Sequence, residues 1–333
     1  HISKQYGKQK ILENISLEIK SGEIFGIIGL SGSGKTTFLN TIIGFLKPET
    51  GDVLFKQSHL LDYKGDERIS FRSVYEKEFE LKRMFGFAAQ NPSFYNKLSC
   101  EDNLDYFGSL YGLSKDIRRT NAEILLKLMG IYDFRKLDGE ELSGGMQKRL
   151  DIACALIHDP HVLILDEPTS DLDPLSRQQM WDLIREIKSK GTTVLLTSHF
   201  LDELEGLCDR VAILHNKKII RIGTPEEIKS SYSTHQEIRV ETKSMDYTDL
   251  SRNLYNHARS FRIESISPEG KKLLIKSSRS EEVLHHIIHF LERRKEKLLD
   301  ISVSMPLLKE VMQSLIKTED DQCKKEKESL ENK

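Results

Sequence analysis

Cysteine is scarce in this sequence, and its spacing excludes several kinds of site. Four cysteines occur among 333 residues, namely Cys100, Cys154, Cys208 and Cys323. No two of them have the two-residue separation typical of zinc sites and redox motifs, so neither a metal site nor a disulfide framework is predicted. Reduced thiols, as in the cytosol, are expected instead.

Long apolar runs are also missing. The longest, EIFGIIGL at 23–30 and VLILD at 162–166, are much shorter than the roughly 20 residues that a membrane-spanning helix needs. No charged segment followed by an apolar one suggests a signal peptide. We therefore expect no transmembrane segment, and a role at a membrane would require another chain to cross it.

A surplus of charge of one sign is absent as well. The 50 Lys and Arg residues nearly balance the 52 Asp and Glu residues, which gives a net charge of −2. This balance provides no bulk attraction to nucleic acid, so no nucleic-acid partner is expected. Sustained heptads and internal repeats are missing too, which argues against long coiled coils.

What is present is an alternation of apolar runs with helical periodicity. Over the first two thirds of the chain this pattern is typical of an α/β fold with a mostly parallel sheet. The expected elements are strands at 11–19, 23–29, 162–166 and 193–197, helices at 38–46, 175–189 and 200–207, and mostly helical structure over 91–140.

The last third is expected to be a small, separate α+β domain at 236–317. The composition turns polar at 230–236, where we place a linker, and the tail 318–333 lacks apolar periodicity and is expected to be disordered. The expected elements are strands at 237–242, 261–266, 272–277 and 299–304, and helices at 247–258, 281–295 and 306–317.

A glycine-rich phosphate loop directly follows the strand expected at 23–29. Residues 29–36 read GLSGSGKT and match the Walker A pattern GxxxxGK[ST] in full. Glycines let such a loop wrap phosphates, Lys35 would reach the β- and γ-phosphates, and the Thr36 hydroxyl would ligate Mg²⁺. A chance glycine-rich turn is the alternative, but the strand before and the helix after favour a nucleotide site.

An acidic strand end occurs in VLILDEP at 162–168. Asp166 would lie at the carboxyl edge of the sheet, where ligands of α/β sheets bind. We expect Asp166 to hold Mg²⁺ and Glu167 to polarise the attacking water as general base. A helix cap is the structural alternative; the phosphate loop in the same chain favours the catalytic interpretation.

A second helix start suited to phosphate occurs in LSGGM at 142–146. The free N–H groups of a Ser-Gly-Gly helix start, together with the helix dipole, favour an anion. The sequence that follows, QKRLDIACALI, reads as an amphipathic core helix. A chain with one nucleotide site has no evident need of two such starts.

Together these motifs resemble the ATP-binding subunit of an ATP-binding cassette (ABC) transporter. The phosphate loop, LSGGMQ, LDEP, the SDLD run at 170–173 and His199 after a buried strand carry the resemblance over residues 1–230. It implies a P-loop NTPase fold, with a RecA-like core and an ABC helical subdomain at about 91–150, and ATP and Mg²⁺ as ligands. Within the family, the chain is most similar to drug, antibiotic or multidrug export (ABC-2 type) cassettes.

The resemblance also assigns residues to two half-sites. Two cassettes pack head to tail, so Ser143, Gly144, Gly145 and Asp173 are expected to contact the partner's ATP. The chain's own ATP is expected to be held by Tyr6, stacking on adenine, by Gly29, Leu30, Ser31, Gly32, Ser33, Gly34, Lys35, Thr36 and Thr37, and by Gln90. The expected catalytic residues are Glu167, His199 and Lys35, and the Mg²⁺ ligands are Thr36, Gln90 and Asp166.

Three features depart from this pattern or fall outside it. The segment 57–84 is longer than usual and reads as an insertion or surface hairpin, and Asp171 stands where a small residue is usual. His285 and His289 have a spacing that can bind zinc. Because they lie off the apolar stripe of their helix, a solvated face is the favoured interpretation.

The function implied is ATP hydrolysis that powers a transporter, most similar to an exporter. Its partners would be membrane-spanning permease subunits and a second cassette, in a homodimer or a heterodimer. Its place would be peripheral, at the cytoplasmic face of the cell membrane. The alternatives are an importer cassette, a non-transport ABC ATPase acting on ribosomes or DNA, and a small-molecule kinase, in which LSGGM has no role.

Overall fold

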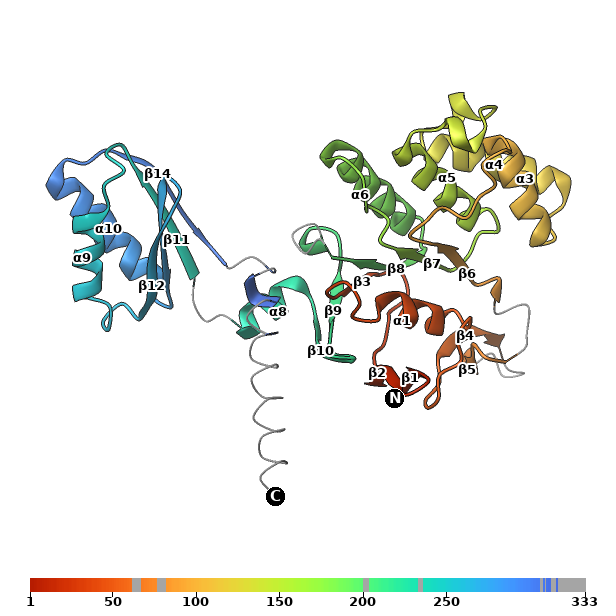
Figure 1. Cartoon of the computed structure of the whole chain (residues 1–333), viewed down its shortest axis with the longest axis horizontal. Coiled ribbons are helices and arrows are strands. Elements are labelled where there is room, and N and C mark those ends of the chain that lie inside the picture. Colours follow the sequence, from red (N-terminus) through yellow and green to blue (C-terminus); the bar gives the residue numbers. More distant parts are fainter. Residues whose placement is uncertain are drawn as a thin grey trace, which may run out of the picture. The chain divides into compact units, whose positions relative to one another are not determined.

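The computed structural model describes residues 1–61, 67–76, 82–199, 204–232, 236–305, 308, 310–312 and 316. The chain divides into two compact units, His1–Thr224 and Pro225–Lys333 (Figure 1). Each unit has its own sheet and its own buried apolar cluster.

A six-stranded sheet forms the centre of the first unit, in the order β10-β9-β3-β8-β7-β6. Neighbours from β9 to β6 are parallel, and only the edge strand β10 is antiparallel to its neighbour. The predicted mostly parallel α/β fold is thus confirmed. The strands are β3 (Ile24–Ile28), β6 (Phe85–Ala88), β7 (Val162–Asp166), β8 (Thr193–Ser198), β9 (Arg210–His215) and β10 (Lys218–Gly223).

The core of this unit lies between the central strands and the helix after the phosphate loop. Phe38, Leu39 and Ile42 on α1 (Lys35–Ile42) are buried in one cluster with Phe25 and Ile27 of β3. The helix is shorter than the expected 38–46 and begins earlier. It ends before Gly44, whose φ of 78° does not continue a helix.

Two small antiparallel pairs complete the sheet structure of the first unit. The strand expected at 11–19 ends at Ile15, after Asn14 with a φ of 50°. The segment 57–84 contains a hairpin, although its first strand begins before residue 57, and residues 62–66 and 77–81 lie outside the described ranges. The pairs are β1 (Ile2–Tyr6) with β2 (Gln9–Ile15), and β4 (Leu54–Leu61) with β5 (Glu67–Ser73).

Helices cluster in the segment between β6 and β7, and Figure 1 shows α3, α4 and α5 grouped there. Each begins after a serine whose hydroxyl accepts a backbone N–H, namely Ser99, Ser114 and Ser143. The part of 91–140 before Cys100 is not helical. The helices are α3 (Cys100–Leu110), α4 (Lys115–Leu128), the 3₁₀ turns η1 (Tyr132–Phe134) and η2 (Gly139–Glu141), α5 (Gly144–Leu156) and, after β7, α6 (Pro174–Ser189).

An aromatic stack joins the α3–α4 turn to the end of α5. The Tyr111 and His158 rings are stacked, with centroids 3.6 Å apart and an interplanar angle of 10°. His158 Nε2 lies 3.1 Å from the Phe85 carbonyl oxygen, so Nε2 carries the proton and donates. Burial lowers the pKa of His158 to about 4, because the charged ring would be desolvated.

This stack should make the first unit less stable in mild acid. Since the pKa of His158 is lowered from 6.5 to about 4, its stabilising contribution is present above pH 6.5 and is lost as the pH falls toward 4. Between pH 7 and pH 5 we expect it to account for about 1–2 kcal/mol of the free energy of unfolding. Urea unfolding at both pH values tests this, with His158→Phe as control, since that variant stacks but does not titrate. Equal pH dependence in both proteins would contradict the assignment.

The second unit contains a four-stranded antiparallel sheet in the order β12-β13-β11-β14. Apolar residues of α9 and α10 share one buried cluster with those of β11 and β13. The elements are α8 (Pro225–Tyr232), β11 (Gln236–Thr242), α9 (Thr248–Asn256), β12 (Ile263–Glu269), β13 (Lys272–Ser277), α10 (Ser280–Arg294) and β14 (Leu298–Ser304).

Several predictions for the later part of the chain can be compared with the structure only in part. The expected linker at 230–236 is wrong in part, because α8 continues to Tyr232 and β11 begins at Gln236. Most of the expected helix at 306–317, the whole tail 318–333, and residues 200–203 of the expected helix at 200–207 lie outside these ranges.

The histidines of α10 behave as expected of a solvated face. His285 and His289 are exposed, whereas Val283, Ile287 and Leu291 enter the apolar cluster. No group of three or more potential metal-ligating side chains is found among the described residues. Within the same ranges, no helix has the length and apolar character needed to cross a membrane.

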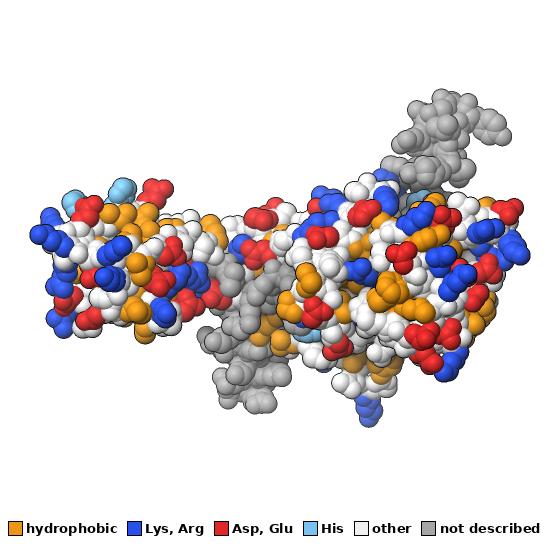
Figure 2. Space-filling model, turned by 90° about the horizontal axis from the view of Figure 1, so that it is seen from above, with side chains coloured by type: hydrophobic (Ala, Val, Ile, Leu, Met, Phe, Trp, Pro, Cys, Tyr) orange, Lys and Arg blue, Asp and Glu red, His pale blue; other side chains and the backbone are white. Residues whose placement is uncertain are grey.

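The molecular surface carries charges of both signs. Figure 2 shows Lys and Arg side chains interspersed with Asp and Glu over the face in view. This agrees with the near-zero net charge. It gives no support to a strong electrostatic attraction to nucleic acid on that face.

Candidate nucleotide-binding site

The carboxyl ends of four adjacent parallel strands place the predicted site residues along one sheet edge. The strands lie in the order β3-β8-β7-β6. Gly29 follows β3, His199 follows β8, Glu167 follows β7, and Gln90 comes two residues after β6. The fold therefore brings together residues separated by up to 170 positions in the sequence, at the edge where ligands of α/β sheets bind.

The phosphate loop has backbone conformations that favour glycine. Gly32 and Gly34 have φ values of 76° and 103°, and Gly34 is the residue directly before α1. A Cβ on Gly34 would lie 3.0 Å from Ile11. The Ser33 hydroxyl is buried and has no hydrogen-bond partner among the described residues, so this loop can accommodate a polar ligand such as a phosphate.

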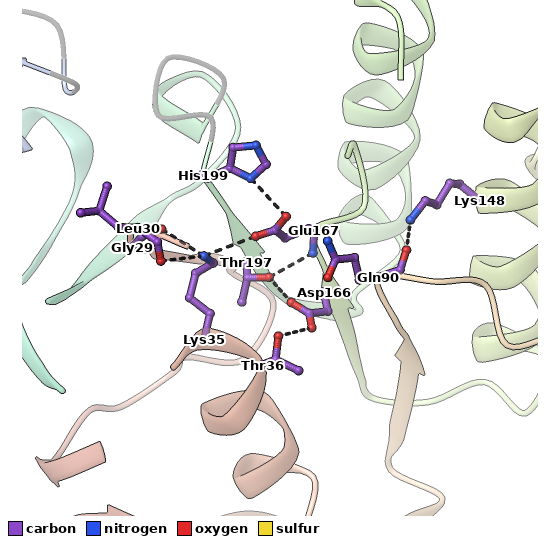
Figure 3. Close-up of polar contacts among 10 residues, drawn as sticks. All are labelled: Gly29, Leu30, Lys35, Thr36, Gln90, Lys148, Asp166, Glu167, Thr197 and His199. Carbon is purple, nitrogen blue, oxygen red and sulfur yellow. Dashed lines mark hydrogen bonds and ion pairs between the residues drawn. The ribbon is translucent and has the colours of Figure 1, made fainter. Parts of the chain in front are cut away.

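Lys35 is buried at the centre of the site, where it is surrounded by acceptors (Figure 3). Its Nζ donates to the carbonyl oxygens of Gly29 at 3.0 Å and Leu30 at 3.3 Å. It also forms an ion pair with Glu167 Oε1 at 3.3 Å. The ammonium thus links the phosphate loop to the end of β7.

Asp166 is held by two threonine hydroxyls. Thr36 Oγ1 donates to Asp166 Oδ2 at 2.7 Å, and Thr197 Oγ1 donates to Asp166 Oδ1 at 2.6 Å. Thr197 Oγ1 also accepts the N–H of Glu167 at 3.0 Å. The hydroxyl and carboxylate oxygens of Thr36 and Asp166 are the hard ligands that Mg²⁺ prefers, and they already lie together.

Glu167 and His199 form the outer part of the cluster. His199 Nδ1 lies 3.1 Å from Glu167 Oε2, so a proton on Nδ1 makes the histidine the donor. Glu167 has a φ of 50°, a strained conformation that non-glycine residues seldom adopt and that the surrounding structure must hold in place.

Gln90 reaches the same edge from the neighbouring strand. The parallel register pairs Ala88 with Leu165, so two further residues bring Gln90 to the level of Glu167. Its side chain is exposed, and its carbonyl oxygen accepts a hydrogen bond from Lys148 of α5 (Figure 3).

Tyr6 lies apart from this cluster, on β1. The residue is 50% exposed, and the ammonium of Lys4 lies 5.9 Å from the ring centroid. An open aromatic face is what adenine stacking would require. Among the described residues, no hydrogen bond or ring contact joins Tyr6 to the residues around Lys35.

The second helix start forms a separate group with the start of α6. Ser143 Oγ accepts the N–H of Met146 at 3.4 Å, and a Cβ on Gly144 would have no atom within 4 Å. A Cβ on Gly145 would lie 3.6 Å from Ser176 Oγ, so this turn lies beside the start of α6. There Asp173 Oδ1 accepts the N–H groups of Leu175 and Ser176, each at 3.0 Å. The hydrogen bonds from Ser176 hold the pKa of Asp173 below its usual value.

The structure therefore joins six predicted residues directly, and adds one that the sequence analysis missed. Besides these six, which are Gly29, Leu30, Lys35, Thr36, Asp166 and Glu167, it joins a seventh predicted residue, His199, to Glu167. The missed residue is Thr197, and its signal is a polar residue inside the buried run TVLLTS. Among the described residues, no hydrogen bond joins Ser143 or Asp173 to this cluster.

Known proteins share both the motifs and the fold. The ABC transporter family pattern matches residues 12–170. The chain is 33% identical over 236 residues to the probable multidrug ABC transporter ATP-binding protein YbhF of Escherichia coli, covering 71% of this chain but only 38% of that protein. It is 32% identical over 322 residues to the doxorubicin resistance ATP-binding protein DrrA of Mycobacterium tuberculosis, covering 93% of this chain and 90% of DrrA.

A solved structure extends the similarity to three dimensions. The ATP-binding cassette MJ0796, in a dimeric post-hydrolysis state with ADP and Pi, superposes with a TM-score of 0.57 at 27% identity, over 67% of this chain and 96% of MJ0796. Relatives that align along nearly the whole chain, together with this fold, establish the family. This chain belongs to the ABC transporter family and has the P-loop NTPase fold of its ATP-binding cassettes.

Proposed function

We propose that this chain is the ATP-binding and ATP-hydrolysing subunit of an ABC exporter. The observation that carries the proposal is the contact of Glu167 with Lys35 and His199, beside the Thr36–Asp166 pair. This set combines a phosphate-binding cation, a candidate base and two oxygen ligands for a metal within one network.

Each residue of the network has a distinct proposed role. Lys35 and the N–H groups of residues 29–37 bind the phosphates, while Tyr6 stacks on adenine. Thr36, Asp166 and Gln90 would hold Mg²⁺, which would supply charge neutralisation at the phosphates. Glu167 accepts the proton of the attacking water, and His199 orients that carboxylate and contacts the γ-phosphate.

The group at the second helix start is proposed to act on a different ATP molecule. Ser143, Gly144, Gly145 and Asp173 would contact ATP held by a second cassette. The N–H groups at the start of α5 suit a phosphate, and no described hydrogen bond joins these four residues to the cluster around Lys35. Closure of the pair would then depend on the γ-phosphate, and hydrolysis would remove that contact and allow opening. The dimeric state of MJ0796 supports this arrangement.

The domain assignment follows the same proposal. Residues 1–230 would form the cassette with its helical subdomain at about 91–150, 236–317 the accessory domain, and 318–333 a polar tail. Permease subunits would cross the membrane, and this chain would lie peripherally at its cytoplasmic face. Export is favoured over import because the names of YbhF and DrrA refer to multidrug transport and doxorubicin resistance.

The head-to-tail arrangement predicts that Ser143→Arg blocks ATP-driven pairing without unfolding the monomer. An arginine at this helix start would occupy the open space beside Gly144. Light scattering with and without ATP, in a Glu167→Gln background that preserves the nucleotide, measures the pairing. Ser109→Arg, at an exposed serine on α3, is the matched control and should still pair. A Ser143→Arg protein that dimerises with ATP as well as the control would refute the arrangement.

A further inference from the structure

A buried lysine on α5 holds the main chain next to Gln90. Lys148 is only 9% exposed, and its Nζ donates a hydrogen bond to the Gln90 carbonyl oxygen (Figure 3). Gln90 lies 58 positions earlier in the sequence, two residues after β6. A cation fixed to this carbonyl restricts where the Gln90 side chain can point.

An aspartate one turn further along α5 holds the same loop at a second point. Asp151 is 2% exposed, and its Oδ1 accepts the Ser93 N–H at 2.8 Å and the Ser93 hydroxyl at 3.0 Å. Lys148 and Asp151 are three residues apart and therefore lie on one face of the helix. Together they fix residues 90 and 93 to α5, and we call this set of contacts the loop clamp.

The loop clamp is an unfavourable way to stabilise a fold. Burial takes the Lys148 ammonium out of water, and its described hydrogen-bond partner is a single carbonyl oxygen, that of Gln90. Burial raises the pKa of Asp151 to about 6, and Asp151 Oδ2 has no hydrogen-bond partner among the described residues. Buried charges of this kind cost more than apolar residues of the same shape, so packing alone does not account for them.

We infer that Lys148 and Asp151 are positioning residues that hold Gln90 in register with α5, and so with the Ser143 turn at which α5 begins. This inference rests on the proposed function, because Gln90 is assigned there to the chain's own Mg²⁺ and Ser143 to the partner's ATP. A helix is a stiff element, so a shift of α5 on binding the partner's ATP moves Gln90 as well. The loop clamp thereby couples the two ATP sites.

Lys148→Met tests this inference with least disturbance of the fold, because methionine fills similar space without charge. We expect ATP binding without Mg²⁺ to stay within about twofold of wild type, since Lys35 and residues 29–37 are untouched. Turnover should fall at least about tenfold, with a higher Mg²⁺ concentration needed for half-maximal rate. Lys148→Arg keeps the cation and should recover part of the rate, whereas Lys190→Met, at an exposed site directly after α6, should behave as wild type.

A second variant covers the case in which Lys148→Met does not fold. Asp151→Asn keeps an acceptor for Ser93 and removes the desolvated charge, so its thermal midpoint should equal or exceed that of wild type. Its turnover should nevertheless fall and its Mg²⁺ requirement rise, because the buried Lys148 ammonium loses an opposing charge on the same face of α5. A merely structural pair would leave the Mg²⁺ requirement unchanged.

The outcomes separate this inference from the proposed function. Wild-type protein that binds and hydrolyses ATP, with Lys148→Met or Asp151→Asn showing the same rate and Mg²⁺ requirement, would overturn the role of the loop clamp alone. Wild-type protein that neither binds nor hydrolyses ATP would overturn the proposed function, and the inference with it. Reduced turnover with unchanged Mg²⁺-free binding is the result that supports both.

Discussion

Glu167→Gln is expected to slow ATP turnover by about 10²-fold or more, because an amide cannot accept the proton of the attacking water. Glutamine has nearly the same shape as glutamate, so the backbone at φ 50° and the N–H bond to Thr197 should persist. Steady-state phosphate release measures the rate. A variant with normal turnover would remove Glu167 as the base.

The same substitution should leave ATP binding intact or make it tighter. Glu167 Oε1 forms an ion pair with Lys35 Nζ, and both side chains are largely buried. Removing the carboxylate charge frees the ammonium for phosphate oxygens. Titration with a fluorescent ATP analogue tests this, and a clearly weakened affinity would show that Glu167 supports binding and not only chemistry.

Lys35→Ala is expected to abolish tight ATP binding and, with it, turnover. The ammonium already lies beside the Gly29 and Leu30 carbonyl oxygens at the start of the phosphate loop. Among the described side chains, Glu167 forms ion pairs with Lys35 and, when the ring is protonated, with His199. Alanine would leave the Glu167 carboxylate facing the phosphates without compensation, and like charges repel.

Folding of the Lys35→Ala variant must be checked first, because removing one partner of a buried ion pair destabilises a protein. Circular dichroism and the thermal midpoint must show a folded variant before its ATP affinity is interpreted. Lys35→Arg preserves the charge and should fold more stably than Lys35→Ala. A folded Lys35→Ala protein with unchanged ATP turnover would refute the assignment of the site.

The two variants separate binding from chemistry. Glu167→Gln should bind ATP without efficient hydrolysis, whereas Lys35→Ala should do neither. If the two had the same ATP affinity, the proposed division of roles between Lys35 and Glu167 would be wrong.

Much of the fold could be predicted because its strands are buried on both faces. Continuous apolar runs mark β3, β7 and β8, and the strand at Val162–Asp166 agrees with the expected range to the residue. The strands β1, β6, β9 and β10 were not predicted. β10 lies at a sheet edge and is half exposed, so its sequence KIIRIG lacks a strong pattern.

The site residues could be predicted where the signal lies within a few neighbouring residues, and could not where it depends on the tertiary fold. Lys35, Thr36, Asp166 and Glu167 occur in contiguous motifs whose chemistry is encoded within a few residues. Thr197 and the loop clamp depend instead on which strands and helices become neighbours. Nothing in the local sequence around Lys148 shows that its ammonium meets a carbonyl 58 positions away.

The central claim is that this cassette drives a membrane transporter, and its partners test that claim most directly. The measurement is purification of the tagged chain from its native membranes in mild detergent, followed by mass spectrometry of the proteins that accompany it. The account predicts a multi-span membrane protein in stoichiometric amount. Recovery from the soluble fraction alone, or together with ribosomal or DNA-bound proteins, would contradict the transporter function while leaving the ATPase chemistry to be judged by Glu167→Gln.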